Sequence, residues 1–255
     1  MGVQTATYTW FGPRVSGESL GQCIVSQVRE WYEQTYGDRL KTFLGPGTMA
    51  ILIRGDPWRV RFPLLFGNFV AACIPEPSSW RGPADAAVFN VFDDIEGFTA
   101  GLGRDLTDAE CADILLAYTC GLEALQALRG LAHNKFIPEA IGDQQAAVVS
   151  IFADPPQYGA SRWHSLQLVE KLFKCYIGSR GGKVSKHHRL RRHALDAGGL
   201  GLDVPDSSLL SAVQCNAGVR YGEVGSTLTQ AIEAHQASLE ICRLIAPQIG
   251  VCQSP

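Results

Sequence analysis

The second half of the chain repeats apolar residues at spacings of three and four, which is the period of amphipathic helices. Thr107-x-x-Glu110 opens this half with the capping-box pattern, in which each side chain can bond the other residue's free backbone N–H. Pro138 suits the first turn of a second helix, and Pro155-Pro156 ends that helix. We expect only helices after residue 107, covering about 107–125, 138–153, 161–177, 206–217 and 226–246.

The first hundred residues show a different pattern. Leu20, Ile24, Val28 and Trp31 follow the helical period, and Gly37 is placed to end that helix. Short apolar runs then alternate with turn residues, which predicts strands over 49–53, 60–62, 66–74 and 88–92 and a loop over 75–86. The expected fold class is therefore α+β and mainly α: an N-terminal helix with a small antiparallel sheet, followed by an antiparallel helical bundle.

The diproline at 155–156 is the predicted boundary between two units. These are an α+β unit over 1–155, with strands at about 48–92 and helices at about 107–153, and a helical bundle over 157–247. No apolar run approaches the roughly 18 residues that span a bilayer, and the polar N-terminal residues lack the features of a secretory signal. The eight cysteines are scattered without a Cys-x-x-Cys pair, as in reduced proteins. We therefore expect a cytoplasmic protein with no membrane partner.

Charge is distributed unevenly along the chain. Residues 162–193 carry nine Lys or Arg side chains and one acid, Glu170, so this segment has a net charge of +8, whereas the whole chain has −3 and the remainder −11. A cationic stripe on a mildly acidic protein attracts a polyanion or a phosphate-bearing ligand without making the whole surface basic. The stripe therefore predicts an anion-binding face within the helical second half.

Several short motifs surround this stripe: Ser161-Arg162-Trp163, Gln167, Glu170-Lys171-x-x-Lys174, His188-x-Leu190, Ala197 and Val219-Arg220-Tyr221-Gly222. Their order and spacing resemble a HEPN domain, the higher-eukaryote and prokaryote nucleotide-binding family, over roughly residues 157–247. The resemblance implies a small antiparallel helical bundle that often dimerises. Many members carry His-Asp-Leu where this chain has His188-Arg189-Leu190, and a leucine where His193 stands.

The resemblance also implies a chemistry. Many HEPN proteins are metal-independent ribonucleases that use an arginine followed, after four to six residues, by a histidine. Arg180 and His187, with six residues between them, are the corresponding catalytic pair. In such a site the histidine acts as general acid or base near neutral pH, and the arginine holds the scissile phosphate. The family's arginine usually begins a helix, whereas Gly181-Gly182 follows it here.

The leading hypothesis is a HEPN-like protein that binds nucleotide or RNA phosphate and acts, if catalytic, as a metal-independent endoribonuclease in prokaryotic stress or phage defence. The bundle is the expected surface of a homodimer, and no metal or other cofactor is expected. The alternative is a non-catalytic adaptor that uses the bundle for dimerisation or partner binding, so the sequence leaves enzymatic activity open. The residues expected to contact phosphate are Lys174, Arg180, Lys183, Lys186, His188, Arg191 and Arg192.

Other residues allow further interpretations. Arg129 and His133, and likewise Arg189 and His193, are four apart and would share a helix face as arginine–histidine pairs. For Arg129 and His133 the alternative is a basic helix C-terminus that opposes the helix dipole. The remaining candidates are a metal site at His187, His188 and His193, a magnesium site at Asp93-Asp94-x-Glu96, a phosphate-contacting glycine loop over 178–185, a functional hairpin turn flanked by Arg54 and Arg59, and a core or interface histidine at His235.

Overall fold

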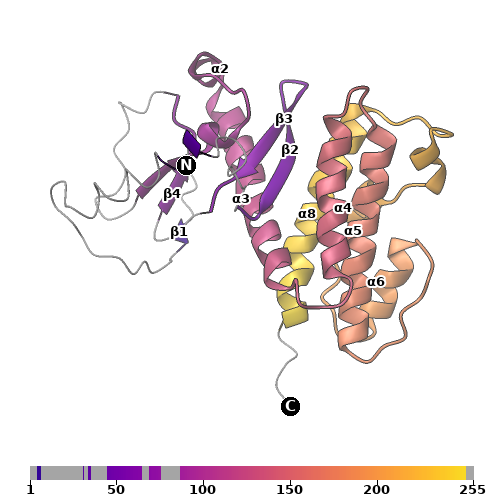
Figure 1. Cartoon of the computed structure of the whole chain (residues 1–255). Helices are drawn as coiled ribbons and strands as arrows, with labels where there is room; N and C mark the ends of the chain where they lie inside the picture. The colour runs from indigo at the N-terminus through magenta and orange to yellow at the C-terminus, as the bar shows by residue number, and fades with distance from the viewer. Residues whose placement is uncertain are drawn as a thin grey trace.

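A computed structural model describes residues 5–6, 31, 34–35, 45–64, 69–75 and 87–250. The helix predicted over Leu20 to Trp31 lies outside the described residues, except that Trp31, Gln34 and Thr35 are helical. The described chain is α+β and mainly helical: small strands come first, and seven helices, α2 to α8, follow and pack as a bundle (Figure 1). This confirms the predicted class in its broad outline.

A β-hairpin joins the strands β2 (Gly47–Ile53) and β3 (Asp56–Phe62), which pair antiparallel with Ile53 opposite Asp56. The two turn residues, Arg54 and Gly55, both have positive φ angles of 53° and 91°. Two such residues make the tight turn whose twist suits a hairpin. One face of the hairpin is buried, through Met49, Ile51, Ile53, Val60 and Phe62. The predicted pair of antiparallel strands is therefore present, with its turn one residue earlier than Gly55-Asp56-Pro57.

The second sheet has the order β1 (Thr5–Ala6), β4 (Phe69–Ala72), β5 (Ala87–Asn90). Strand β1 pairs antiparallel with β4, but β4 and β5 pair parallel, so the prediction of a purely antiparallel sheet is wrong for this pair. Fourteen residues separate β4 from β5, which is the length that a crossover between parallel strands needs and far more than a hairpin turn. A short 3-10 helix, η3 (Val91–Asp94), follows β5.

The helices of the bundle are α2 (Ala100–Asp105), α3 (Asp108–Gly130), α4 (Ile137–Ile151), α5 (Tyr158–Ser179), α6 (Leu190–Gly198), α7 (Ser207–Val213) and α8 (Leu228–Gly250). The four long ones, α3, α4, α5 and α8, match predicted helices. Helices α2 and α6 were not predicted, and the helix expected over 206–217 is shorter, because residues 217–221 form the 3-10 helix η4. Figure 1 shows α4 and α5 side by side, with α6 against the lower part of α5.

The first long helix begins with the predicted capping box. The backbone N–H of Glu110 donates to the Thr107 hydroxyl over 3.2 Å, and the backbone N–H of Thr107 donates to the Glu110 carboxylate over 2.7 Å. Arg54 of the hairpin turn reaches the same carboxylate, with 2.7 Å between Nε and Oε1, so the hairpin is tied to the start of α3. The capping box therefore also anchors the strands to the bundle.

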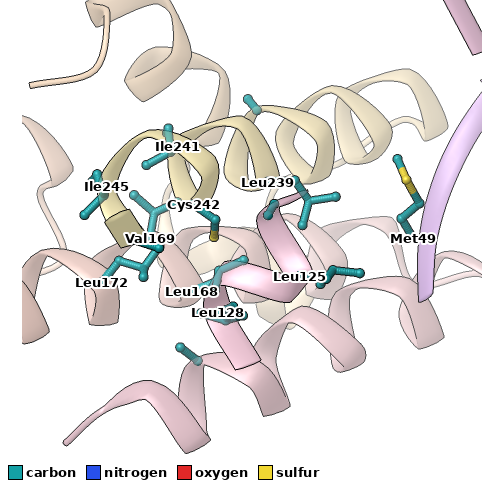
Figure 2. Packing of buried hydrophobic residues seen from close by; sticks show 14 of the residues in the cluster. Met49, Leu125, Leu128, Leu168, Val169, Leu172, Leu239, Ile241, Cys242 and Ile245 are labelled. Carbon is teal, nitrogen blue, oxygen red and sulfur yellow. The ribbon is translucent and has the colours of Figure 1, made fainter. Parts of the chain in front are cut away.

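The main apolar cluster of the core includes residues on both sides of position 156, and a small second cluster consists of Ala50, Ile151, Ala231 and Ile232. Figure 2 shows Leu125 of α3, Leu168 and Leu172 of α5 and Leu239 of α8 packed together, with Met49 of β2 at one end. By length and composition α3 is apolar enough to cross a membrane, as buried core helices also are, and its buried face packs in this cluster. The division into units 1–155 and 157–247 stays a prediction, although helices from both halves share this core.

Candidate functional site

The basic loop begins where α5 ends in a Schellman motif. The N–H of Gly182 donates to the carbonyl of Ile177 over 2.8 Å, and the N–H of Gly181, whose φ angle is +71°, donates to the carbonyl of Gly178 over 3.1 Å. A Cβ at position 182 would lie 2.6 Å from Leu200 Cδ1. The two glycines therefore end the helix and let the loop pass close to Leu200, and Arg180 lies at the C-cap of α5.

The far end of the loop is fixed by His193, which lies wholly inside the bundle. Its Nε2–H donates to the backbone carbonyl of His187 over 2.8 Å, and the centroids of the two imidazole rings are 4.3 Å apart. Burial lowers the pKa of His193 below its ordinary value. The proposed Arg189–His193 pair is therefore separated, because Arg189 is exposed at the N-cap of α6 while His193 points inward.

Gln214 fixes the same end of the loop from α7. Its side-chain oxygen accepts a hydrogen bond from the backbone N–H of Leu190 over 2.9 Å, and its amide nitrogen donates to the carbonyl of His188 over 3.2 Å. These two bonds satisfy backbone groups at the start of α6, where a helix leaves its first N–H groups unpaired. The loop thus enters α6 with its backbone bonded to two neighbouring elements.

A buried carboxylate lies beneath the loop. Only 2% of the Glu170 side chain is exposed, and it accepts hydrogen bonds from His188, over 2.7 Å between Nδ1 and Oε2, and from the ammonium of Lys174. The amide of Gln167 approaches the same oxygen at 3.4 Å, and the Trp163 ring meets the His188 ring edge-on with centroids 5.3 Å apart. Two predicted phosphate contacts, Lys174 and His188, therefore share one carboxylate, and Lys174 is mostly covered.

A second carboxylate, on the neighbouring helix α4, is bound in the same way. Asp143 of α4 accepts hydrogen bonds from His164 Nδ1, over 2.9 Å, and from the ammonium of Lys171. Each carboxylate thus binds one histidine and one lysine. The sequence did not single out Asp143 and His164 as site residues. The available signal was the spacing of three, four and three between His164, Gln167, Lys171 and Lys174, which places these polar side chains on one face of α5.

The other predicted contacts lie along the loop and the first turn of α6. The side chains of Arg180, Lys183, Lys186 and Arg189 are exposed, and within the described chain none of them pairs with a carboxylate. Arg191 donates to the hydroxyl of Ser211, whereas Arg192 pairs with Asp196 over 3.2 Å. The structure thus gathers the predicted cations on one face while leaving most of them facing solvent.

The predicted catalytic pair has separate surroundings. The guanidinium of Arg180 lies over the ring of Tyr176, 5.1 Å from its centroid. His187 packs on His193 and lies 3.0 Å from the Ser185 hydroxyl through Nε2. Across the part of the chain that is described, no hydrogen bond joins Arg180 to His187. The two side chains therefore have different partners in this structure.

Most of the alternative groups have structural partners. Arg129 donates to the carbonyl of Pro46 over 3.1 Å, while Arg59 and Arg61 both pair with Glu96. Asp94 accepts from the Tyr118 hydroxyl over 2.7 Å, and burial raises the pKa of Asp94 to about 7. Among the residues that the structure describes, no three His, Cys, Asp or Glu side chains come together as a metal site. These groups therefore support the fold at the hairpin and α3.

His235 is a core residue of α8. It is completely buried, neither ring nitrogen has a hydrogen-bond partner in the described chain, and burial lowers its pKa to about 4. The imidazole is therefore neutral at physiological pH. His235 therefore lies in the core, as one of the interpretations expected. A core histidine usually bonds a neighbour through its ring, and no described residue does so here.

No family model, no curated protein and no solved structure matches this chain. The HEPN resemblance therefore stays a prediction from the quoted motifs. The functional argument rests on the geometry of the loop, α5 and α6.

Proposed function

We propose that the chain is a HEPN-like helical bundle that binds the phosphate groups of a nucleotide or RNA at the basic face formed by the loop 180–189 and the start of α6. The observation that carries this proposal is the row of exposed cations without carboxylate partners, Arg180, Lys183, Lys186 and Arg189, on a chain of net charge −3. Acidic residues are abundant elsewhere in this chain, so ion pairs could have formed here. Cations left facing solvent are available to an external anion.

The spacing of these cations favours a chain of phosphates. Basic side chains recur at 180, 183, 186, 189, 191 and 192, so that several phosphates of one strand can each meet a cation. Such contacts bind any sequence and release counterions, which makes the affinity fall steeply with salt. Arginine adds paired hydrogen bonds that a single point charge lacks. We therefore favour single-stranded RNA over a mononucleotide as the ligand.

If the protein also cleaves the RNA, we assign phosphate contact to Arg180 and proton transfer to His187. Arg180 contacts Tyr176 and His187 contacts His193, and no hydrogen bond in the described chain joins the two, so this arrangement supports RNA binding more directly than cleavage. His188 is the better oriented imidazole, because the Glu170 carboxylate accepts from its Nδ1 and leaves Nε2 as the second ring nitrogen. A carboxylate in that position fixes the tautomer and orientation of a general base. A ribonuclease built on this face would use His188 beside or instead of His187.

The test is the affinity for a mixed-sequence RNA oligonucleotide, measured by fluorescence anisotropy in a chelator over a range of salt. The triple variant Lys183→Ala, Lys186→Ala, Arg189→Ala is compared with Arg104→Ala, Lys135→Ala, Arg220→Ala, which removes the same charge elsewhere. We expect the loop variant to bind at least about tenfold more weakly and to lose about two units of salt slope, at roughly 0.7 per phosphate contact. Equal losses in both variants would contradict a specific face.

The same reactions test catalysis. Cleavage by the parent that disappears in Arg180→Ala, His187→Ala or His188→Ala, with RNA affinity retained, would support an endoribonuclease and name its residues. RNA binding without cleavage would support a binding protein. Failure to bind RNA or nucleotide would favour the adaptor hypothesis, in which the basic face contacts an acidic protein surface.

A further inference from the structure

An open groove of about 670 Å³ lies between α3, α8 and α7. Its walls run from Asp113 to Glu123 on α3 and from Glu233 to Arg243 on α8, which at 1.5 Å per residue is about 15 Å on each helix. Leu116, which is 69% exposed, stands in this groove. Its length and apolar walls fit a short helix better than a compact ligand.

The rim of the groove is acidic. Asp113, Glu123 and Glu233 are exposed carboxylates at its edge. The guanidinium of Arg243 in the groove wall is bound by Glu240, with 2.8 Å between Nε and Oε2, and lies 3.8 Å from the carboxylate of Glu123. Asp113 and Glu233 have no ion pair among the described residues. The groove therefore presents apolar side chains between uncompensated negative charges, and an apolar helix edged by cations would be complementary to it.

Helix α6 of the same chain has the complementary surface. Its exposed face carries Leu195, which is 69% exposed, next to Arg191 and Arg192. Its nine residues give a length of about 14 Å, close to that of the groove. Leu190, His193, Ala194 and Ala197 are buried inside the chain's own bundle, whereas Leu195 and the two arginines are exposed; Arg192 pairs with Asp196 of the same helix, and Arg191 donates to Ser211. No residue of α6 lines the groove of its own chain.

We propose that α6 of one copy docks in the α3/α8 groove of a second copy. Leu195 meets Leu116 and the apolar walls, while Arg191 and Arg192 face the carboxylates of Asp113 and Glu233. Because the two surfaces differ, each contact is head-to-tail, and α6 of each copy can enter the groove of the other in a two-fold pair or the contacts can continue from copy to copy. In both arrangements every contact joins one α6 to one groove.

This association regulates the basic face. Arg191 and Arg192 are among the residues proposed to contact phosphate, so in this respect the inference rests on the proposed function. RNA on those arginines and a second copy on α6 exclude each other. Binding of RNA therefore releases subunits from the assembly.

The experiment uses two matched substitutions of exposed leucines, Leu116→Glu in the groove and Leu195→Glu on α6. Val149→Glu on α4, where the valine is 63% exposed, is the control for adding a charge to a helix surface. Molar mass is measured by analytical ultracentrifugation at low salt and high protein concentration. The parent and Val149→Glu should form a dimer or a larger species, and each leucine variant alone should associate at least about tenfold more weakly.

Mixing the two leucine variants gives the decisive result. Each keeps one intact surface, so a one-to-one mixture should form a dimer and stop there. A parent that stays monomeric, a mixture that does not associate, or a leucine variant that assembles like the parent would each overturn the docking. Leu116→Glu, which leaves α6 unchanged, should retain RNA affinity, so a failure of RNA binding in the parent would count against the proposed function without affecting this result. Assemblies that persist at saturating RNA would overturn the mutual exclusion.

Discussion

The imidazole of His188 lies against the carboxylate of Glu170, with 2.7 Å between Nδ1 and Oε2, and so joins the basic loop to the interior of α5. The carboxylate is 2% exposed and also accepts from Lys174. A buried carboxylate held by two hydrogen-bond donors keeps its position only while those donors remain. This pairing is therefore both a support of the loop and a part of the proposed binding face.

Glu170→Ala should destabilise the protein strongly. The substitution leaves the mostly covered ammonium of Lys174 without its partner, and breaking a buried ion pair costs about 3–5 kcal/mol. The free energy of unfolding from urea denaturation measures this loss. Asp203→Ala is the control, because among the described residues the exposed Asp203 bonds to Gln248 through its backbone and not through its carboxylate. A loss below about 1 kcal/mol would show that the carboxylate is not the support described here.

Gly182→Ala should destabilise the protein by about 1–3 kcal/mol, because the added Cβ would lie 2.6 Å from Leu200 Cδ1 and 2.8 Å from Ile177 Cγ2. The matched control is Gly142→Ala on α4, where a Cβ meets nothing within 4 Å. In a helix interior that substitution should stabilise by about 0.5–1 kcal/mol. Thermal and urea unfolding give the change in the free energy of unfolding for each variant, and we expect opposite signs. The same sign in both would contradict a tight passage of the loop at Leu200.

His235 should make the protein less stable in acid. Its folded-state pKa of about 4 lies below the ordinary 6.5, so between these values the unfolded chain binds a proton that the folded chain does not. Stability from this residue is present above about pH 6.5 and is lost as the pH falls through about 4, a loss of about 3 kcal/mol. His235→Leu should remove this part of the pH dependence. The free energy of unfolding of each protein is measured at pH 7 and at pH 4.5. The change between the two pH values is then compared between the parent and His235→Leu, so that the contribution of all other titrating groups cancels.

Thr107→Ala should cost about 1 kcal/mol, because the start of α3 loses the hydroxyl that accepts from the Glu110 N–H. Thr107→Ser keeps that hydroxyl and should retain most of the stability. Urea denaturation of both variants separates the cap from the methyl group. An equal loss in the two would mean that the side chain's packing matters here more than its hydrogen bond.

The long helices were predictable because their period is set by burial. Ile114, Tyr118, Leu122 and Leu125 repeat at spacings of three and four, and all four are buried on one face of α3. Helix α6 was missed because its buried face consists largely of Ala194, Ala197 and His193, which give a weak apolar signal among arginines. The parallel pairing of β4 with β5 was also missed, since alternation along a strand does not specify its neighbour.

The candidate site was predictable as a set of residues but not as a set of pairs. Lys174 and His188 were named as phosphate contacts from charge and family resemblance, whereas Glu170 entered as a motif residue and as the one acid in a basic segment, not as their common partner. Asp143 and His164 are 21 residues apart and on different helices. Such a pair is set by how α4 packs on α5, which local spacing does not reveal. The head-to-tail surfaces likewise depend on which leucines the folded bundle leaves exposed.

The fixed ends of the basic loop have a further consequence for binding. Gly182 is bonded to Ile177 at one end, and the His187 carbonyl is bonded to His193 at the other. A flexible loop would lose conformational entropy on closing around a ligand, at about 1–2 kcal/mol for each residue whose backbone becomes ordered. Here that entropy is already lost during folding, so an arriving phosphate meets cations on an ordered backbone and only their side chains remain to be immobilised.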